Sequence, residues 1–179
     1  MIDAGIFTIV APNWQSCAQC PVLKNNYPKL YDMSYLTPKL NQPIFFSHSS
    51  KGKNPLISNG WQPFAEDWGV WSDGKLAQLI LPAPVNQQKK IELNLRAFIV
   101  GKEAYLPISI QLNAGPIAQL ELKHFENNRV VLDLPDDSPQ NQYLLVKFSI
   151  ESPKKPKDYG LNLDDRLIGI GLKSIQYLP

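Results

Sequence analysis

Residues 60–74 combine aromatic rings with a carboxylate in a way that suits sugar recognition. Trp61, Trp68 and Trp71 lie in this segment, and Glu66 falls between the first two. An indole offers a flat apolar surface to a sugar ring, and a carboxylate accepts hydrogen bonds from sugar hydroxyls. The segment therefore predicts a platform made by at least one exposed ring, with Glu66 fixing the position of the ligand.

The same rings also have a purely structural interpretation. Tryptophan carries a large apolar area and is usually buried, while the three glycines of the segment favour tight turns. We expect Trp61 and Trp71 to be buried, whereas both roles stay open for Trp68. Glu66 and Ser72 would then either bond to the loop or touch a ligand.

A second polar group of the sequence precedes the last expected strand, where Asp165 and Arg166 are adjacent. Neighbouring residues of an extended chain point to opposite sides, so these two need separate partners. An ion pair between Arg166 and Glu66 would tie this region to the tryptophan segment. The alternative is a pair of solvated charges on a loop.

Metal and cofactor motifs are weak. Cys17 and Cys20 have C-x-x-C spacing, but there is no second cysteine pair and the two histidines are isolated, so free thiols are favoured over a disulfide or a metal half-site. The pairs Asp136–Asp137 and Asp164–Asp165 could hold a structural calcium ion, although turn-forming aspartates explain them better. We expect no cofactor.

Catalytic motifs are also missing. The sequence has no G-x-S-x-G elbow and no glycine pattern for a nucleotide phosphate. Paired carboxylates for glycoside hydrolysis cannot be placed from the acids available, which include Glu66, Asp73, Asp133 and Asp165. The sequence therefore assigns no catalytic residue and favours a protein without catalytic activity of its own.

The composition limits the partners. Eighteen basic and sixteen acidic side chains give a formal charge of +2 and form no long block of one sign, which argues against nucleic acid. No apolar run is long enough to span a membrane, and the first residues do not resemble an export signal. We expect a cytoplasmic protein, with any association with the inner membrane made through a partner.

The expected elements are nearly all strands. Sixteen prolines interrupt possible helices, and residues 1–42 read as an irregular arm. Residues 43–179 hold one domain of short runs with alternating apolar residues, bounded by turn residues. These runs cover residues 44–47, 76–81, 90–100, 106–113, 117–123, 129–134, 143–151 and 167–177.

In the run 90–100 the alternation gives one apolar and one polar face, and the last run changes phase, which predicts a bulge near Lys173. Many such strands with short connections predict an all-β, antiparallel two-sheet sandwich of the jelly-roll type, preceded by the irregular N-terminal arm.

The sequence resembles a β-sandwich module attached to bacterial enzymes that assemble cell-surface polysaccharides. The resemblance covers about residues 43–179 and rests on motif residues in three places, which are Gly60-Trp61, Glu66-x-Trp68-Gly69-x-Trp71-Ser72-x-Gly74 with Ala77-x-Leu79, and Asp165-Arg166-Leu167-x-Gly169. Such modules are jelly-roll, carbohydrate-binding-type domains joined to glycosyltransferases. No transferase domain is present in this sequence, so a stand-alone module, a subunit and a fragment all stay open.

The resemblance implies a non-catalytic module that binds or positions a glycan, or a glycosyltransferase, during bacterial surface polysaccharide biosynthesis. The candidate ligand-binding residues are Trp61, Glu66, Trp68, Trp71, Ser72, Asp165 and Arg166. One alternative is a structural docking module that uses a sheet face containing Ile117 or Leu145, both of which fall on the solvent-facing parity. Another is a glycoside hydrolase with two carboxyl groups in one groove.

Overall fold

The computed structural model describes residues 39–48, 54–85, 87–135 and 143–179. The predictions for the N-terminal arm up to residue 38, for Cys17 and Cys20, and for Asp136–Asp137 fall outside these residues. Within the described ranges, no helix has the length and apolar character needed to cross a bilayer.

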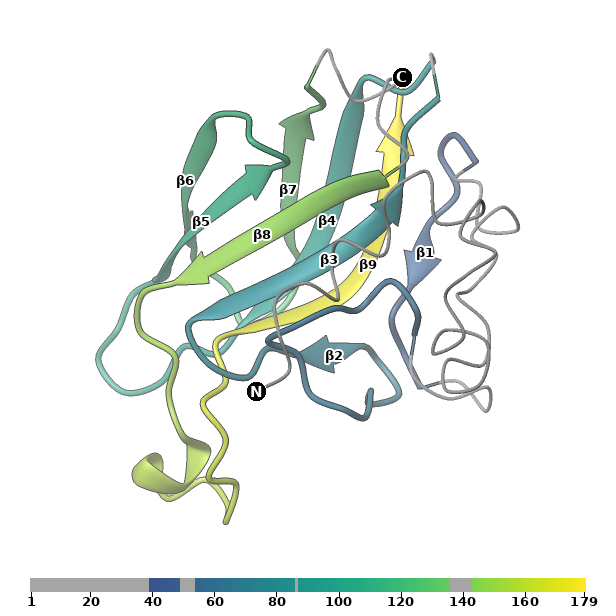
Figure 1. Cartoon of the computed structure of the whole chain (residues 1–179). Helices are drawn as coiled ribbons and strands as arrows, with labels where there is room; N and C mark the ends of the chain where they lie inside the picture. Colours follow the sequence, from purple (N-terminus) through teal and green to yellow (C-terminus); the bar gives the residue numbers. More distant parts are fainter. Residues whose placement is uncertain (1–38, 49–53, 86, 136–142) are drawn as a thin grey trace, which may run out of the picture. The chain divides into compact units, whose positions relative to one another are not determined.

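Two antiparallel sheets form the described domain (Figure 1). One sheet has the strand order β1-β9-β4-β7, with β2 also pairing with β9, and the other has the order β3-β8-β5-β6. The strands are β1 (Ile44–Phe45), β2 (Val70–Trp71), β3 (Leu76–Pro82), β4 (Lys90–Ala97), β5 (Leu106–Leu112), β6 (Ile117–Leu122), β7 (Asn128–Asp133), β8 (Tyr143–Ile150) and β9 (Ile170–Leu178).

The chain passes between the sheets at nearly every connection. Among the strands of the described residues, only the pairs β1–β2 and β5–β6 follow one another within one sheet, so strands that are distant in sequence lie side by side. In Figure 1, β3 and β8 cross in front of β4 and β9. This interleaved order, with four main strands in each sheet, is that of a jelly roll, and it confirms the predicted all-β two-sheet sandwich.

The core lies between the two sheets and follows the alternation of the sequence. In β4, Ile91, Leu93 and Leu95 are fully buried, and in β8, Val146 and Phe148 face them from the other sheet's side of the core. Burying one apolar face of every long strand against the other sheet is the main source of stability in such a sandwich.

The predicted bulge in the last strand is confirmed. Asn94 of β4 pairs with Ser174, and the next residue, Leu95, pairs with Leu172, so Lys173 is the extra residue of β9. The bulge lets Leu172 and Ile175 both point into the core although they differ in parity.

The connection from β8 to β9 carries a short 3₁₀ helix, η5 (Pro156–Tyr159), and extends from the lower end of the sandwich in Figure 1, the end at which β2 lies. Its return path is bonded to the tryptophan segment, because the Gly74 amide donates to the Leu167 carbonyl at 2.7 Å and the Ser72 amide donates to the Ile170 carbonyl at 2.7 Å. Two segments about a hundred positions apart in sequence therefore form one end of the domain.

Candidate functional site

The tryptophan segment folds back on itself as an irregular hairpin. Trp61 pairs with Ser72, and Glu66 pairs with Gly69. The Glu66 amide donates to the Gly69 carbonyl at 2.7 Å, which leaves Trp68 in the turn at the tip. Each of the three indoles consequently has a different environment.

Trp61 belongs to the core. Only 6% of the residue is exposed, its Nε1 donates to the Gln78 carbonyl at 2.9 Å, and its ring meets the ring of Phe148 edge-on at 5.6 Å. With its polar nitrogen satisfied and its ring covered, Trp61 has a structural role.

Trp71 lies in a small separate cluster. Its residue is 7% exposed and packs with Phe98 and Ile168, while Trp68 and Val100 cover the cluster from outside. The Trp71 and Trp68 rings meet edge-on at 5.0 Å. Trp71 therefore supports Trp68 from below and presents little of its own surface.

Trp68 is only half-buried, and two polar side chains hold it. Its Nε1 donates to Glu66 Oε2 at 2.6 Å, and the guanidinium carbon of Arg96 lies 3.8 Å from the ring centroid. Arg96 is itself paired with Glu126 at 2.5 Å. One part of the indole is thus covered by a cation, a favourable arrangement for an aromatic ring, and the ring is held beside the carboxylate of Glu66.

The Trp68 ring has room on the sheet because of Gly171. In register, Gly171 of β9 lies opposite Trp71 of β2 on one side and opposite Arg96 of β4 on the other. A Cβ at position 171 would lie 2.5 Å from Cη2 of Trp68. Since real Cβ atoms do not approach so closely, the ring can occupy this position only above a glycine.

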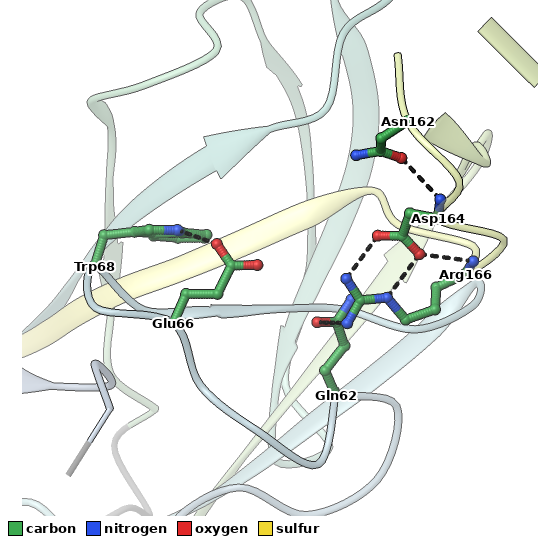
Figure 2. A network of polar contacts seen from close by, with 6 residues as sticks. All are labelled: Gln62, Glu66, Trp68, Asn162, Asp164 and Arg166. Atoms are coloured by element: carbon green, nitrogen blue, oxygen red, sulfur yellow. Dashed lines mark hydrogen bonds and ion pairs between the residues drawn. The ribbon is translucent and has the colours of Figure 1, made fainter. Parts of the chain in front are cut away.

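Opposite Trp68 and Glu66, the β8–β9 connection supplies a network of polar groups (Figure 2). The Asp164 carboxylate accepts two bonds from the Arg166 guanidinium, from Nε at 2.8 Å and from Nη2 at 2.6 Å. The Asp164 amide donates to Asn162 Oδ1 at 2.8 Å, and the Arg166 amide donates to Asp164 Oδ1 at 3.0 Å. The Arg166 guanidinium lowers the pKa of Asp164, and Asp164 in turn raises the pKa of Arg166.

Arg166 ties the two motif regions together, but not through Glu66. Its Nη1 donates to Oε1 of Gln62, a side chain of the tryptophan segment that is 2% exposed. The sequence offered an ion pair with Glu66 as one possibility, and the structure has Asp164 as the ion-pair partner instead. Asp164 lies two residues away from Arg166, so a local bidentate pair forms at a small entropic cost.

The Glu66–Trp68 pair on one side and the network of Asn162, Asp164 and Arg166 on the other border a surface hollow of about 300 Å³, which we call the Trp68 hollow. This volume is at the lower end of small-molecule sites, so the hollow suits a single small unit rather than a large ligand. It is lined by Glu66, Trp68, Trp71, Arg96, Phe98, Phe125, Pro156, Leu161, Asn162, Asp164, Arg166 and Ile168.

Four of the seven candidate site residues line this hollow, namely Glu66, Trp68, Trp71 and Arg166. Trp61 lies in the core instead. The remaining two have local partners elsewhere: the buried hydroxyl of Ser72 accepts from the amides of Gly169 at 3.2 Å and Ile170 at 3.0 Å, and Asp165 pairs with Lys155 at 2.9 Å. Ser72 therefore fixes the start of β9, the first of the two roles considered for it.

Sequence reasoning missed the lining residues that come from other elements. Arg96 and Phe98 surround the end of β4, Phe125 follows β6, and Asn162 with Asp164 lies in the β8–β9 connection. Only the last two carried a usable signal, because the spacing N-x-D-x-R is typical of side chains that bond to the amide two residues on. The contact of Arg96 with Trp68 depends on sheet register and has no local signature.

The acidic residues near the hollow are held by cations rather than arranged around a metal. Asp164 bonds to Arg166 and Asp165 bonds to Lys155. Among the described residues there is no group of three histidine, cysteine, aspartate or glutamate side chains placed to hold a metal ion. The Asp164–Asp165 pair, considered above for calcium, is thus committed to ion pairs in this structure.

The hollow can bind by stacking and hydrogen bonding, and its Asp164 carboxylate is unsuited to act as a general acid. Asp164 has both oxygens bonded to Arg166, which lowers its pKa, so it cannot donate a proton near neutral pH. Glycoside hydrolysis normally needs one such donor. Asp164 is therefore not the acid that the hydrolase alternative requires.

Comparison with known proteins adds little. No protein-family model matches the chain, and no curated protein matches it. Among solved structures, the functional form of the mosquito-larvicidal Cry4Aa toxin from Bacillus thuringiensis shares 12% identity over 62% of this chain and 19% of its own, with a TM-score of 0.37. A family GH115 4-O-methyl-α-glucuronidase with specificity for decorated arabinogalactans shares 9% identity over 84% of this chain and 18% of its own, with a TM-score of 0.41.

The chain therefore spans less than a fifth of either protein. Both likenesses are too distant to carry an argument about function. The resemblance to accessory domains of glycosyltransferases stays a prediction.

Proposed function

We propose that this domain is a non-catalytic module that binds a saccharide in the Trp68 hollow. The observation that carries the proposal is the half-buried indole of Trp68, bonded to the Glu66 carboxylate at 2.6 Å, in the wall of a hollow of about 300 Å³. An apolar ring beside a fixed hydrogen-bond acceptor matches a sugar, which has an apolar face and a rim of hydroxyls.

The apolar part of the site has two rings. Arg96 covers part of Trp68, so a ligand meets the remaining surface of this indole and the ring of Phe125, which is 48% exposed. Asn162 and Arg166 add polar groups on the opposite wall. With so few directed contacts, we expect weak affinity for one sugar unit and stronger binding only for a repeated ligand.

The biological setting follows from the sequence resemblance. In that setting the module would hold a growing or finished glycan near a glycosyltransferase during bacterial surface polysaccharide biosynthesis.

A glycan array followed by titration calorimetry tests the proposal. The proteins are the full chain, Trp68→Ala and Phe64→Ala, where Phe64 is a control from the same segment that is 79% exposed and does not line the hollow. We expect binding by the wild type and by Phe64→Ala, and loss in Trp68→Ala with folding intact. The proposal would be overturned if the wild type bound no neutral, amino or acidic glycan, or if Trp68→Ala bound with the same affinity as the wild type.

A docking role is the second candidate, and the outer face of the β3-β8-β5-β6 sheet favours it. Ile117 is 57% exposed and Leu76 is 66% exposed, and both border a shallow depression of about 190 Å³ on this face. Leu145, the other residue considered above, is half-buried. Exposed apolar residues beside a depression are typical of contact surfaces.

Sedimentation velocity of the full chain and of Ile117→Glu tests the docking candidate in its simplest form, contact between two copies. A concentration-dependent dimer that Ile117→Glu abolishes would support it. If the chain is a monomer at all concentrations, docking between two copies is rejected and the saccharide proposal is unaffected.

A further inference from the structure

Of the charged side chains that line the Trp68 hollow, some have an ion-pair partner and one does not. This difference should determine which sugars bind, according to their charge. Four charged side chains line the hollow, two carboxylates and two guanidiniums: Glu66, Asp164, Arg96 and Arg166. Arg166 is bonded twice to Asp164, and Arg96 is paired with Glu126 at 2.5 Å. Each guanidinium thus already has a carboxylate partner.

Glu66 differs from the other three. Among the described residues it forms no ion pair, and its hydrogen bond from Trp68 Nε1 engages only Oε2. Figure 2 shows its carboxylate between the Trp68 ring and the Asp164–Arg166 pair, with its second oxygen directed away from the indole. This oxygen is free to accept a hydrogen bond from a ligand.

We propose that the negative charge of Glu66 determines the charge of the ligand, so that the hollow binds amino-bearing or neutral sugars and disfavours acidic ones. The inference rests on the saccharide-binding function proposed above. A protonated amine or a pair of hydroxyls donates to the free oxygen of Glu66, whereas a ligand carboxylate placed there meets the negative charge of Glu66, which only the more distant Arg166 offsets in part.

The two guanidiniums do not reverse this preference. An acidic sugar could accept from the Arg166 N–H groups that Asp164 and Gln62 leave unused, but the charge of Arg166 is already balanced by Asp164 and that of Arg96 by Glu126. A ligand carboxylate there would add a further negative charge beside a guanidinium that an acidic side chain already neutralises, so it gains less than it would from an unpaired arginine.

Three methyl pyranosides that differ in one substituent test the inference. Methyl glucoside, methyl glucosaminide and methyl glucuronide present a neutral, a cationic and an anionic form of one ring, and each is titrated into the full chain by NMR. We expect the glucosaminide to bind about tenfold more tightly than the glucuronide, the size of one charge-assisted hydrogen bond.

Glu66→Gln keeps the shape and a hydrogen-bond acceptor while it removes the charge. In this variant we expect the amino-over-acidic preference to fall to about threefold or less, with affinity for the neutral glucoside little changed. Asp165→Asn, which removes a charge outside the hollow, is the matched control and should keep the wild-type preference.

The outcomes separate the two claims. If the glucuronide binds as tightly as the glucosaminide while Trp68→Ala still loses binding, the charge inference is wrong and saccharide binding stands. If Glu66→Gln keeps the full preference for the glucosaminide over the glucuronide, the inference is also wrong, because a group other than Glu66 then causes the preference. If no glycoside and no glycan on the array binds, the proposed function itself fails.

Discussion

At the scale of single residues, three tryptophans of one short segment serve three purposes. Trp61 is a core residue whose ring nitrogen is hydrogen-bonded, Trp71 packs in the small separate cluster with Phe98 and Ile168, and Trp68 faces the hollow. The residue type is the same in each case, so the difference comes from what the fold places around each ring.

This difference predicts unequal stability costs. Trp61→Ala should lower the free energy of unfolding by about 3–5 kcal/mol, because it removes a fully packed ring and one of the two donors to the Gln78 carbonyl, which also accepts from the Ser58 amide. Trp68→Ala should cost clearly less, since its ring is half-exposed. Urea denaturation followed by circular dichroism measures both. Equal costs would show that Trp68 is a core residue.

Ser72 gives a second prediction at this scale. Its buried hydroxyl accepts from two amides at the start of β9, and Ser72→Ala leaves both without this acceptor. We expect a loss of about 1–3 kcal/mol of unfolding free energy. The control is Ser149→Ala on the exposed face of β8, which should change stability by less than about 0.5 kcal/mol. Similar values for the two variants would contradict the structural role of Ser72.

The residue types of the site were partly readable from the sequence. Trp68, Glu66 and Arg166 were candidates because aromatic, acidic and basic side chains have recognisable chemistry. Arg96 was not, since it was one of several polar residues alternating with the apolar residues of its strand. Its contact with Trp68 arises from pairing of β4 with β9, which no local pattern encodes.

At the scale of elements, the register of β9 builds the floor of the site. Gly171 lies opposite both Trp71 and Arg96, so that the Trp68 ring can lie above it. The bulge at Lys173 sets this register without removing Ile175 from the core.

Gly171→Ala should therefore act through Trp68. The new methyl group must displace the Trp68 ring from its place beside Arg96, and we expect a shift in tryptophan fluorescence, weaker saccharide binding and a stability loss of about 1–3 kcal/mol. The same substitution in a Trp68→Ala background should cost much less, because the clash with the indole is gone and only the milder approach to Arg96 Cβ, at 3.1 Å, remains. Additive costs in this double-mutant cycle would show that the glycine serves another contact.

The β8–β9 connection supplies a pH-dependent contact. The pKa of Asp164 is lowered from 3.8 by its bonds with Arg166, so the pair stabilises the fold fully above this pH and the contribution is lost as pH falls through the lower folded-state value. Asp164→Asn should thus be less stable than the wild type near neutral pH. The difference should shrink at pH values below 3.8.

Urea titrations of the two proteins over a series of pH values check this prediction. Asp158→Asn, on the exposed η5 turn of the same connection, serves as a control for the loss of one negative charge. A difference between wild type and Asp164→Asn that is constant down to the most acidic pH measured would mean that the ion pair does not hold the connection.

The long strands were predictable as elements, and the short ones were not. Alternation over seven or eight residues located β3, β4, β5 and β8 within a few positions, and the phase change located the bulge. β2 has only two residues, Val70 and Trp71, both buried, and so has no alternation to detect. The strand expected over residues 90–100 ends at Ala97, because the side chain of Phe98 packs in the small separate cluster with Trp71 and Ile168.

At the scale of the whole described domain, the fold class followed from the sequence but the site did not. A two-sheet sandwich is nearly forced by many half-apolar strands with short connections. The Trp68 hollow instead gathers residues from four separate regions, near positions 66, 96, 125 and 164. Which connections meet at one end depends on the jelly-roll order, and the order is set by long-range pairing.

The central claim is that the Trp68 hollow binds a saccharide, and one calorimetric comparison tests it most directly. The best glycan from the array is titrated into the wild-type chain, Trp68→Ala and Phe64→Ala under identical conditions. The account predicts measurable binding to the wild type, the same affinity for Phe64→Ala, and at least about a tenfold loss for Trp68→Ala with the fold intact. Unchanged affinity of Trp68→Ala, or no binding of any glycan to the wild type, would contradict it.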